Sequence, residues 1–244
     1  MTINETIRLT ARRFGVELRR YPRWDPAFQQ VALLERNKVD VVLDVGANSG
    51  QYATDLRRFG YTGRILSFEP VKACFDQLLA ASANDHEWTA HKTALGATAG
   101  SSTINVAANN GASSSMLPML ESLVKVAPNT QYLRQETVTV ATVDQIAADH
   151  VKPDARIFLK LDVQGFEREV IQGAKDTLPS VVGVQIEISF VPLYRGGMLY
   201  TEVFDWVASQ GLSLMAIEPM FTDPSTGQLL QADGVFVRDP QGLN

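Results

Sequence analysis

The chain of 244 residues has a formal net charge of -5, a pI near 5.3 and 45% hydrophobic residues, which suits one globular domain with a large core. The acidic balance argues against a general nucleic-acid binder, because such proteins carry a basic stripe and a pI above roughly 9. Cys74 is the single cysteine and allows no internal disulfide, and no apolar run reaches the roughly 18 residues that span a membrane, so we expect a cytoplasmic protein.

The first forty residues are basic, and we expect them to form a helical extension of the main domain. Arginines alternate there with apolar residues: Arg8, Arg12, Arg13, Arg19, Arg20 and Arg23 lie among Ile7, Leu9, Phe14, Val16 and Leu18. Such a segment packs on its own domain or on a second subunit, or it rests on an anionic lipid surface. The pattern favours packing on protein, and it leaves a homo-oligomer and a peripheral membrane contact through the N-terminus open.

From residue 41 to residue 244, short apolar segments alternate with helix-like segments, which predicts a parallel sheet with helices on both faces. The predicted strands are Val41–Val45, Arg64–Phe68, Thr89–Leu95, Ile157–Asp162 and Val182–Ile188. The predicted helices are Gln51–Phe59, Lys72–Ser82, Phe166–Ala174 and Thr201–Gln210. The final stretches "LSLMAIEP" and "GVFVRD" indicate two strands joined by a turn, so we expect the sheet to end with an antiparallel pair.

One interval, at about residues 101–140, interrupts this alternation. It is too polar in its middle for a buried strand and too long for a simple connection. Long insertions at the rim of an α/β sheet are usually binding elements or lids. We therefore expect this insertion to contribute to a ligand site rather than to form a second domain.

The stretch "VVLDVGANSGQY", residues 41–52, places a small loop between a predicted strand and a predicted helix. The fingerprint of dinucleotide-binding loops is G-x-G-x-x-G. Aligned from Gly46, the chain has Asn48 at the second glycine position and Gln51 at the third, so the pattern fails twice. A Walker phosphate loop also fails, because no G-K-[ST] sequence follows.

The remaining pattern is D-x-G-x-N-x-G, with Asp44 at the strand end and glycines at positions 46 and 50. Such a loop lets a methionine-type ligand lie against its backbone while a carboxylate receives the ligand's ammonium group. Glu69, in "LSFEP", lies where an acid hydrogen-bonds ribose hydroxyls in nucleotide-binding folds, although it could instead cap the next helix. The ligand that fits is S-adenosylmethionine.

The chain resembles a known family through several motifs in order: "VVLDVGANSGQY", "ILSFEPV", "HKTALG", "NNGASSSML", "FLKLDVQGFEREVIQGA" and "VQIEISFVPLY". They resemble FkbM-type S-adenosylmethionine-dependent methyltransferases over roughly residues 40–238, and look most like actinobacterial members that O-methylate sugars, including mycobacterial glycolipid deoxysugars. The resemblance implies a Rossmann-like class I fold, α/β with a mainly parallel seven-stranded sheet. It implies cofactor contacts at Asp44, Gly46, Asn48, Gly50 and Glu69, with adenine near Ala94 and Leu95.

Methyl transfer to a hydroxyl requires a general base, or a metal ion that acidifies the hydroxyl. Asp162 is the last residue of a predicted strand and lies on the same face as Lys160, at the end where α/β sheets bind ligands. It is a candidate base, cofactor contact or metal ligand, or it caps the next helix. Glu187, near the end of another buried strand, is a second candidate base. The two carboxylates could hold Mg²⁺ or another divalent cation, or Glu187 could pair with Lys160.

Two further polar residues lie in or near these motifs. His91, in "WTAHKTALG", would be a competent base at neutral pH, although strand histidines are more often simply hydrogen-bonded. Gln164 stands where many of the similar sequences have glutamate. Because an amide cannot act as a base, Gln164 can only orient substrate, and a metal site that uses this position is in doubt.

The walls of the acceptor site are predicted at residues 109–117 and 190–200. Serine hydroxyls in the first segment can bond sugar hydroxyls, and aromatic rings in the second can stack on a sugar face. The serine run could also be a flexible polar turn. The residues concerned are Ser113, Ser114 and Ser115, and Phe190, Tyr194 and Tyr200.

The favoured function is O-methylation of a sugar hydroxyl in a glycolipid, polysaccharide or other glycoside. O-methylation of a non-sugar secondary metabolite remains open, since the acceptor is chosen by the loops. An NAD-dependent oxidoreductase or epimerase is disfavoured by the missing glycines and by the lack of a suitably placed Tyr-x-x-x-Lys pair. A non-catalytic subunit would lack Asp162 and Glu187, which are both present.

Overall fold

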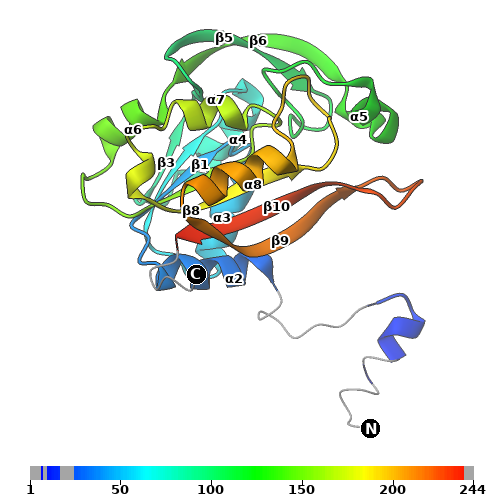
Figure 1. The fold of residues 1–244 in the computed structure, drawn as a ribbon, viewed down its shortest axis with the longest axis horizontal. Helices are drawn as coiled ribbons and strands as arrows, with labels where there is room; N and C mark the ends of the chain where they lie inside the picture. The colour runs from blue at the N-terminus through cyan, green and yellow to red at the C-terminus, as the bar shows by residue number, and fades with distance from the viewer. Residues whose placement is uncertain (1–6, 8–9, 17–24, 239–244) are drawn as a thin grey trace.

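The computed structural model describes residues 7, 10–16 and 25–238. A seven-stranded sheet runs through the molecule in the order β3-β2-β1-β7-β8-β10-β9 (Figure 1). β10 is antiparallel to both of its neighbours and the other pairs are parallel, so the predicted fold class and the antiparallel C-terminal pair are confirmed. The strands are β1 (Val41–Val45), β2 (Arg64–Phe68), β3 (Trp88–His91), β7 (Ile157–Leu161), β8 (Val181–Ser189), β9 (Leu212–Thr222) and β10 (Leu229–Arg238).

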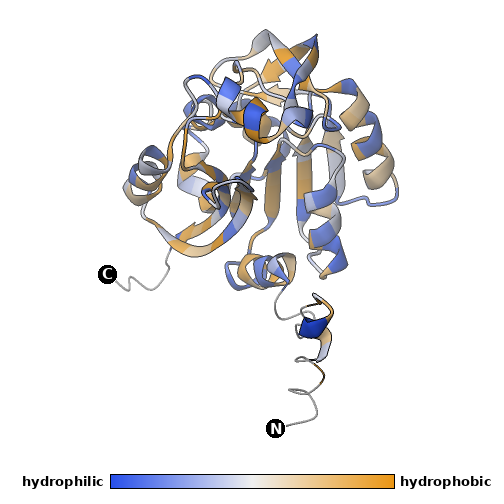
Figure 2. Ribbon diagram, turned by 90° about the vertical axis from the view of Figure 1, so that its right-hand side faces the viewer, coloured by the Kyte–Doolittle hydropathy of each residue, from blue (hydrophilic) through white to orange (hydrophobic). Residues whose placement is uncertain are grey.

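Helices cover both faces of this sheet. On one face pack α6 (Val143–His150), α7 (Glu167–Gln172) and α8 (Tyr200–Ser209), and on the other α2 (Pro26–Arg36), α3 (Gln51–Arg58) and α4 (Lys72–Ser82). Every residue of β1 and β7 is therefore buried, as expected for central parallel strands. Figure 2 shows hydrophobic strands enclosed between the helices.

The predicted strand Thr89–Leu95 is wrong as a single element, because the chain divides there between two sheets. After His91, the Thr93 N–H donates to the His91 carbonyl at 3.0 Å and turns the chain. β4 (Ala94–Leu95) then pairs with β6 (Tyr132–Ala141), which pairs in turn with β5 (Gly100–Ala107). The long insertion forms β5, β6 and α5 (Glu121–Val126). The three-stranded sheet lies above the carboxyl edge of the large sheet (Figure 1).

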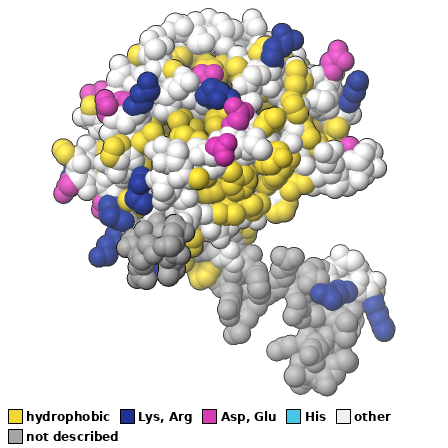
Figure 3. Space-filling view, in the orientation of Figure 1, with side chains coloured by type: hydrophobic (Ala, Val, Ile, Leu, Met, Phe, Trp, Pro, Cys, Tyr) yellow, Lys and Arg dark blue, Asp and Glu magenta, His cyan; other side chains and the backbone are white. Residues whose placement is uncertain are grey.

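The outer strand β9 exposes large apolar side chains, namely Leu214, Met215, Ile217 and Met220. Figure 3 shows apolar atoms gathered on the side of the molecule where β9 and β10 lie. Pro219 interrupts this edge, since proline has no N–H to offer to a further strand. The homo-oligomer stays a prediction.

The N-terminal extension exposes Ile7, Phe14 and Val16. Six residues named in the prediction for this extension lie outside the described residues: Arg8, Leu9, Leu18, Arg19, Arg20 and Arg23. Within the described ranges, no helix is long and apolar enough to cross a bilayer. The peripheral membrane contact also stays a prediction.

A buried ion pair joins β1 to β7. Lys160 Nζ lies 3.2 Å from Asp44 Oδ1 and 3.6 Å from Asp162 Oδ2, and it donates to the Gly46 carbonyl at 2.9 Å. The Asp44 side chain is fully buried, and its Oδ2 accepts the Ser67 hydroxyl at 2.9 Å. Burial lowers the pKa of Lys160, but the carboxylates of Asp44 and Asp162 outweigh it and raise that pKa, so the ammonium stays charged. The alternative pairing of Lys160 with Glu187 is wrong, because Asp44 and Asp162 take this cation.

Replacing Lys160 by methionine should strand the Asp44 carboxylate in an apolar environment. We expect Lys160→Met to lower the free energy of unfolding by about 3–5 kcal/mol in urea denaturation, the usual cost of breaking a buried pair. The double variant Lys160→Met/Asp44→Asn should recover part of that loss. Lys72→Met is the matched control: it breaks the exposed Lys72–Asp76 pair and should cost less than about 1 kcal/mol. Equal urea midpoints for the wild type and Lys160→Met would contradict the structural role.

Candidate active site

A cavity of about 280 Å³ opens at the carboxyl ends of β1, β2 and β7. This is the edge at which α/β sheets bind ligands. The three-stranded sheet and the turn before α5 contribute its other wall. The lining includes Gly46, Asn48, Gln51, Tyr52, Glu69, Ala94, Leu95, Ser114, Ser115, Lys160, Asp162, Gln164, Gln185 and Asp233.

The loop after β1 keeps its shape for local steric reasons. Gly46 has φ +79°, and a side-chain carbon there would collide with the Asp162 carbonyl oxygen. Gly50 has φ +87°, and a side-chain carbon there would lie 2.9 Å from Trp88. Asn48 also has positive φ, and its own Oδ1 accepts the Ser49 N–H at 2.8 Å. The two glycines thus allow close packing. Gly46 and Asn48 line the cavity, whereas Gly50, also predicted as a cofactor contact, does not.

Glu69 follows β2, lines the cavity and is 6% exposed. Its Oε1 accepts the Val71 N–H at 2.8 Å, and its Oε2 accepts the Asn48 N–H at 2.9 Å. Burial raises the pKa of Glu69 to about 7, although these two N–H groups oppose the shift. The carboxylate therefore ties down the start of the next helix, and it also faces the cavity. Its contact with ribose hydroxyls stays a prediction.

Asp44 does not line the cavity. It lies behind the loop against Lys160 and Ser67, with no exposed surface. The prediction that Asp44 contacts the cofactor directly is therefore corrected: Asp44 supports the loop from behind. The carboxylates that do line the cavity are those of Glu69, Asp162 and Asp233.

Gln164 links two carboxylates and a phenol. Its Nε2 donates to Asp162 Oδ1 at 2.8 Å and to Glu187 Oε1 at 3.0 Å, and its Oε1 accepts the Tyr194 hydroxyl at 2.7 Å. The Asp162 side chain is 41% exposed and reaches the cavity. Burial, and then the charges of Asp162 and Glu167, raise the pKa of Glu187 well above its usual range. Asp162 is thus the accessible member of the pair, and Glu187 lies behind it.

This arrangement fits a divalent cation poorly. The Gln164 NH₂ group points at both carboxylates, and N–H groups are hydrogen-bond donors that cannot bind a cation. In the part of the chain that the structure describes, no group of three or more histidine, cysteine, aspartate or glutamate residues could hold a metal ion. The space between the two predicted metal ligands, Asp162 and Glu187, is taken by the amide.

The serine run forms an ordered turn. Ser115 is 1% exposed, and its hydroxyl donates to the Gln164 carbonyl at 2.8 Å. The Ser114 hydroxyl accepts the Ala107 N–H at 3.1 Å, and the Ser113 hydroxyl accepts the Asn109 amide at 2.9 Å. Ser114 and Ser115 line the cavity and Ser113 does not. The run is therefore a polar turn, as the alternative predicted, and all three serine hydroxyls are hydrogen-bonded in it.

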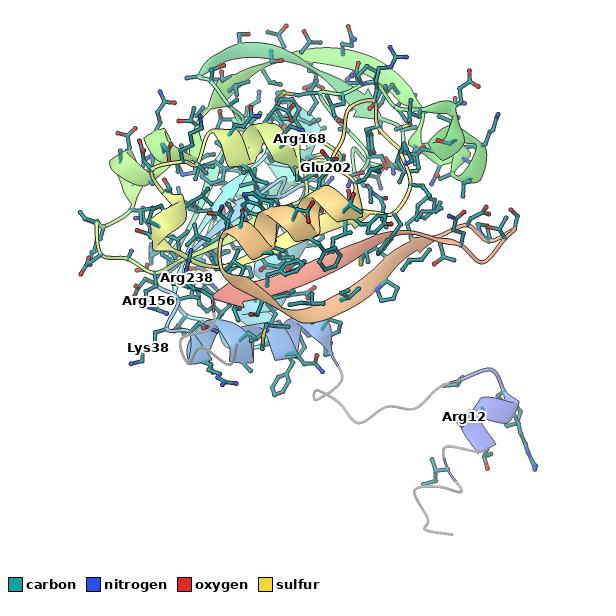
Figure 4. All side chains as sticks on the ribbon, in the orientation of Figure 1. Arg12, Lys38, Arg156, Arg168, Glu202 and Arg238 are labelled. Atoms are coloured by element: carbon teal, nitrogen blue, oxygen red, sulfur yellow. The ribbon has the colours of Figure 1, made fainter. Side chains whose placement is uncertain are left out.

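The aromatic residues of the segment 190–200 lie differently from the prediction. Tyr194 is 3% exposed and does not line the cavity, so it supports Gln164 rather than stacking on a ligand. Phe190 and Tyr200 lie outside the lining as well, with ring centroids 5.8 Å apart. Glu202, two residues after this segment on α8, pairs with Arg168 of α7 at 2.7 Å (Figure 4).

His91 lies outside the cavity. Its ring stacks on Phe68 at 5.1 Å and lies 5.0 Å from the ring of His150. Burial, and then the nearby His150 and Arg64, lower the pKa of His91. The prediction that placed this histidine at the site is corrected. β3 is the edge strand next to β2, and the His91 ring packs against Phe68 of β2.

Sequence reasoning missed Asp233 and Gln185, which line the cavity from β10 and β8. Asp233 lies directly opposite Glu187 in the antiparallel register. A signal was present, since "LLQADGVFV" places an acid in an otherwise mostly apolar strand, the same reason that singled out Glu187.

Several solved structures are similar to the chain. Fibrillarin from Aeropyrum pernix, in complex with natively bound S-adenosyl-L-methionine, has 13% identity and a TM-score of 0.45, with 86% of this chain and 76% of that chain covered. Precorrin-6y C5,15-methyltransferase from Geobacter metallireducens has 10% identity, a TM-score of 0.44 and coverages of 86% and 87%. A SAM-dependent methyltransferase from Aquifex aeolicus has 12% identity, a TM-score of 0.42 and coverages of 87% and 93%.

Comparison with curated proteins finds no match. A family model described as "Methyltransferase FkbM domain" matches residues 44–214, which contain the glycine loop, Glu69, Asp162 and Glu187. The matched region covers well over half of the chain. The chain therefore belongs to the FkbM family of S-adenosylmethionine-dependent methyltransferases.

Proposed function

We propose that the protein transfers a methyl group from S-adenosylmethionine to a hydroxyl of a sugar in a glycolipid, polysaccharide or other glycoside. The observation that carries the proposal is the Asp162 carboxylate. This carboxylate lines the cavity beside the glycine loop. It accepts a hydrogen bond from Gln164, and the Lys160 ammonium lies 3.6 Å from its Oδ2. A carboxylate in this position suits an acceptor whose hydroxyl must lose a proton.

The cavity has the chemistry that the methyl donor requires. S-adenosylmethionine carries positive charge on its ammonium and sulfonium groups, which an acidic wall attracts. Glu69 offers carboxylate oxygens to ribose hydroxyls, and Ala94 and Leu95 offer an apolar surface to adenine. Gly46 and Asn48 would hold the methionine portion against the loop backbone. When bound, the donor supplies a methyl group on a positively charged sulfur.

Asp162 would act as the proton acceptor. Gln164 donates to its Oδ1, which fixes the side chain and leaves lone pairs on both oxygens for the acceptor hydroxyl. Most of the rate enhancement in such a displacement comes from holding the two reactants in line, and a positioned base adds about 10²–10⁴-fold. Ser114, on the opposite wall, can bind further hydroxyls of the acceptor.

The proposal is tested by incubating the protein with labelled S-adenosylmethionine and a panel of glycosides, with monohydroxy aromatic compounds as the comparison. We expect label in a glycoside with EDTA present, because Gln164 occupies the space between the two carboxylates. Label in the aromatic compounds alone would overturn the sugar assignment. Activity only after addition of Mg²⁺ would overturn the metal-free reaction.

Replacing Asp162 by asparagine removes the proton acceptor while keeping a side chain of the same shape. We expect kcat to fall about 10²–10⁴-fold, with a thermal melting curve close to that of the wild type. Asp76→Asn, which changes an exposed carboxylate on α4, is the matched control and should leave kcat unchanged. A kcat for Asp162→Asn within about twofold of the wild-type value would remove Asp162 from this role.

Donor binding should depend on pH through Glu69. Because its pKa in the free protein is about 7, Glu69 is protonated below that pH and ionised above it. If the ionised form binds the ribose hydroxyls, affinity for S-adenosylmethionine falls as the pH drops from about 8 to about 6, approaching tenfold per pH unit below the pKa. Calorimetry across this range measures the slope. Glu69→Gln should bind more weakly and lose this dependence, and a wild-type affinity that does not change with pH would refute the assignment.

A further inference from the structure

Asp233 extends the site across the sheet, away from the donor loop. In the order β2-β1-β7-β8-β10, Glu69 follows β2, the glycine loop follows β1, Asp162 follows β7 and Asp233 lies on β10. Neighbouring strands are about 4.8 Å apart. Glu69 and Asp233 therefore line the cavity on opposite sides of Asp162. If the donor occupies the β1 and β2 side, the β10 side is left for the acceptor.

A chain of buried amides fixes the Asp233 side chain. Gln185 Nε2 donates to Asp233 Oδ2 at 3.0 Å, and Gln185 Oε1 accepts Gln30 Nε2 of α2 at 2.7 Å. Gln30 Nε2 also donates to the Tyr52 hydroxyl at 2.6 Å. Gln30 and Gln185 are each 8% exposed, and buried amides of this kind are costly unless they are satisfied. The chain therefore holds one carboxylate oxygen of Asp233 in a defined position.

The other oxygen, Asp233 Oδ1, receives no hydrogen bond from any residue that the structure describes. The charged groups around it are Asp162 and Lys160 on the β7 side, Glu187 opposite on β8 and Glu218 opposite on β9. Burial and then Asp162 raise the pKa of Asp233 to about 6, with Lys160 opposing. At neutral pH Asp233 is a carboxylate that can only accept hydrogen bonds.

We propose that Asp233 binds a second hydroxyl of the methyl acceptor while Asp162 takes the proton of the reacting hydroxyl. The inference rests on the proposed function and narrows its substrate class. The acceptor is a polyhydroxylated ring with at least two free hydroxyls on the same molecule, so monohydroxy compounds bind the site poorly. Asp233 is then a substrate-binding residue that selects for a sugar.

The test combines one substitution with a series of deoxy acceptors. With a glycoside that the wild type methylates, we expect one mono-deoxy analogue, lacking a hydroxyl other than the methylated one, to lose about 10- to 100-fold in kcat/KM. Asp233→Ala should lose a similar factor with the full glycoside. It should lose little more with that analogue, because the same hydrogen bond is already gone. Losses that simply multiply for every analogue would overturn the proposal.

Two controls separate this role from others. Glu218→Gln changes the carboxylate opposite Asp233 on β9, which does not line the cavity, and it should leave kcat/KM unchanged. Asp233→Asn keeps the size of the side chain and covers the case in which the alanine variant does not fold. Affinity for S-adenosylmethionine, measured by calorimetry, should stay within about twofold in this variant, and a loss of tenfold or more would place Asp233 at the donor and overturn the inference.

The outcome also distinguishes this inference from the function on which it rests. If the wild type methylates no glycoside at all, the proposed function fails and the second-hydroxyl role fails with it. If a glycoside is methylated but the double-variant comparison shows independent losses, the second-hydroxyl role alone fails. Non-additive losses for one hydroxyl position support both and identify that hydroxyl.

Discussion

The rest of the site depends on the contacts of the buried Lys160 ammonium. It pairs with the buried Asp44, donates to the Gly46 carbonyl and lies 3.6 Å from Asp162. A buried lysine is tolerated only when its charge is matched, and here the matching groups are the strand end that begins the glycine loop and the proposed base. One cation therefore fixes the distance between the glycine loop and the proposed base.

Local sequence patterns predicted the central strands and helices well. The bounds of β1, β2 and α4 match the expectation, because a continuous apolar run bounded by polar or turn residues indicates a buried strand and an amphipathic run indicates a helix. The region after His91 was predicted poorly. The stretch from Thr89 to Leu95 contains no glycine or proline that would mark a break, but whether β4 joins the large or the small sheet depends on Val140 and Ala141, far along the chain. A local pattern cannot carry that information.

In the site, too, local patterns identified some residues correctly, and long-range packing placed the others. Glu69 and Asp162 were identified from their places at the carboxyl ends of predicted strands, and both line the cavity. Asp44 matched the D-x-G-x-N-x-G pattern, but its burial behind the loop depends on its ion pair with Lys160 on β7. His91 and Tyr194 had suitable chemistry but face away from the cavity, and Asp233 enters it through the register of β10 against β8. Side-chain direction across strands far apart in sequence decided these cases.

The contact between Lys160 and Gly46 also sets an order of events during synthesis, since 114 residues separate the two. A nascent chain that ends near residue 150 already contains the glycine loop and Glu69, but its Asp44 has no buried cation and Gly46 has no Asp162 carbonyl beside it. At roughly 5–20 residues per second, translation delivers Lys160 on the order of ten seconds after Gly46. Long-range closures of this kind are slow steps in folding. The glycine loop is thus among the earlier parts of the site to be made and among the last to be completed.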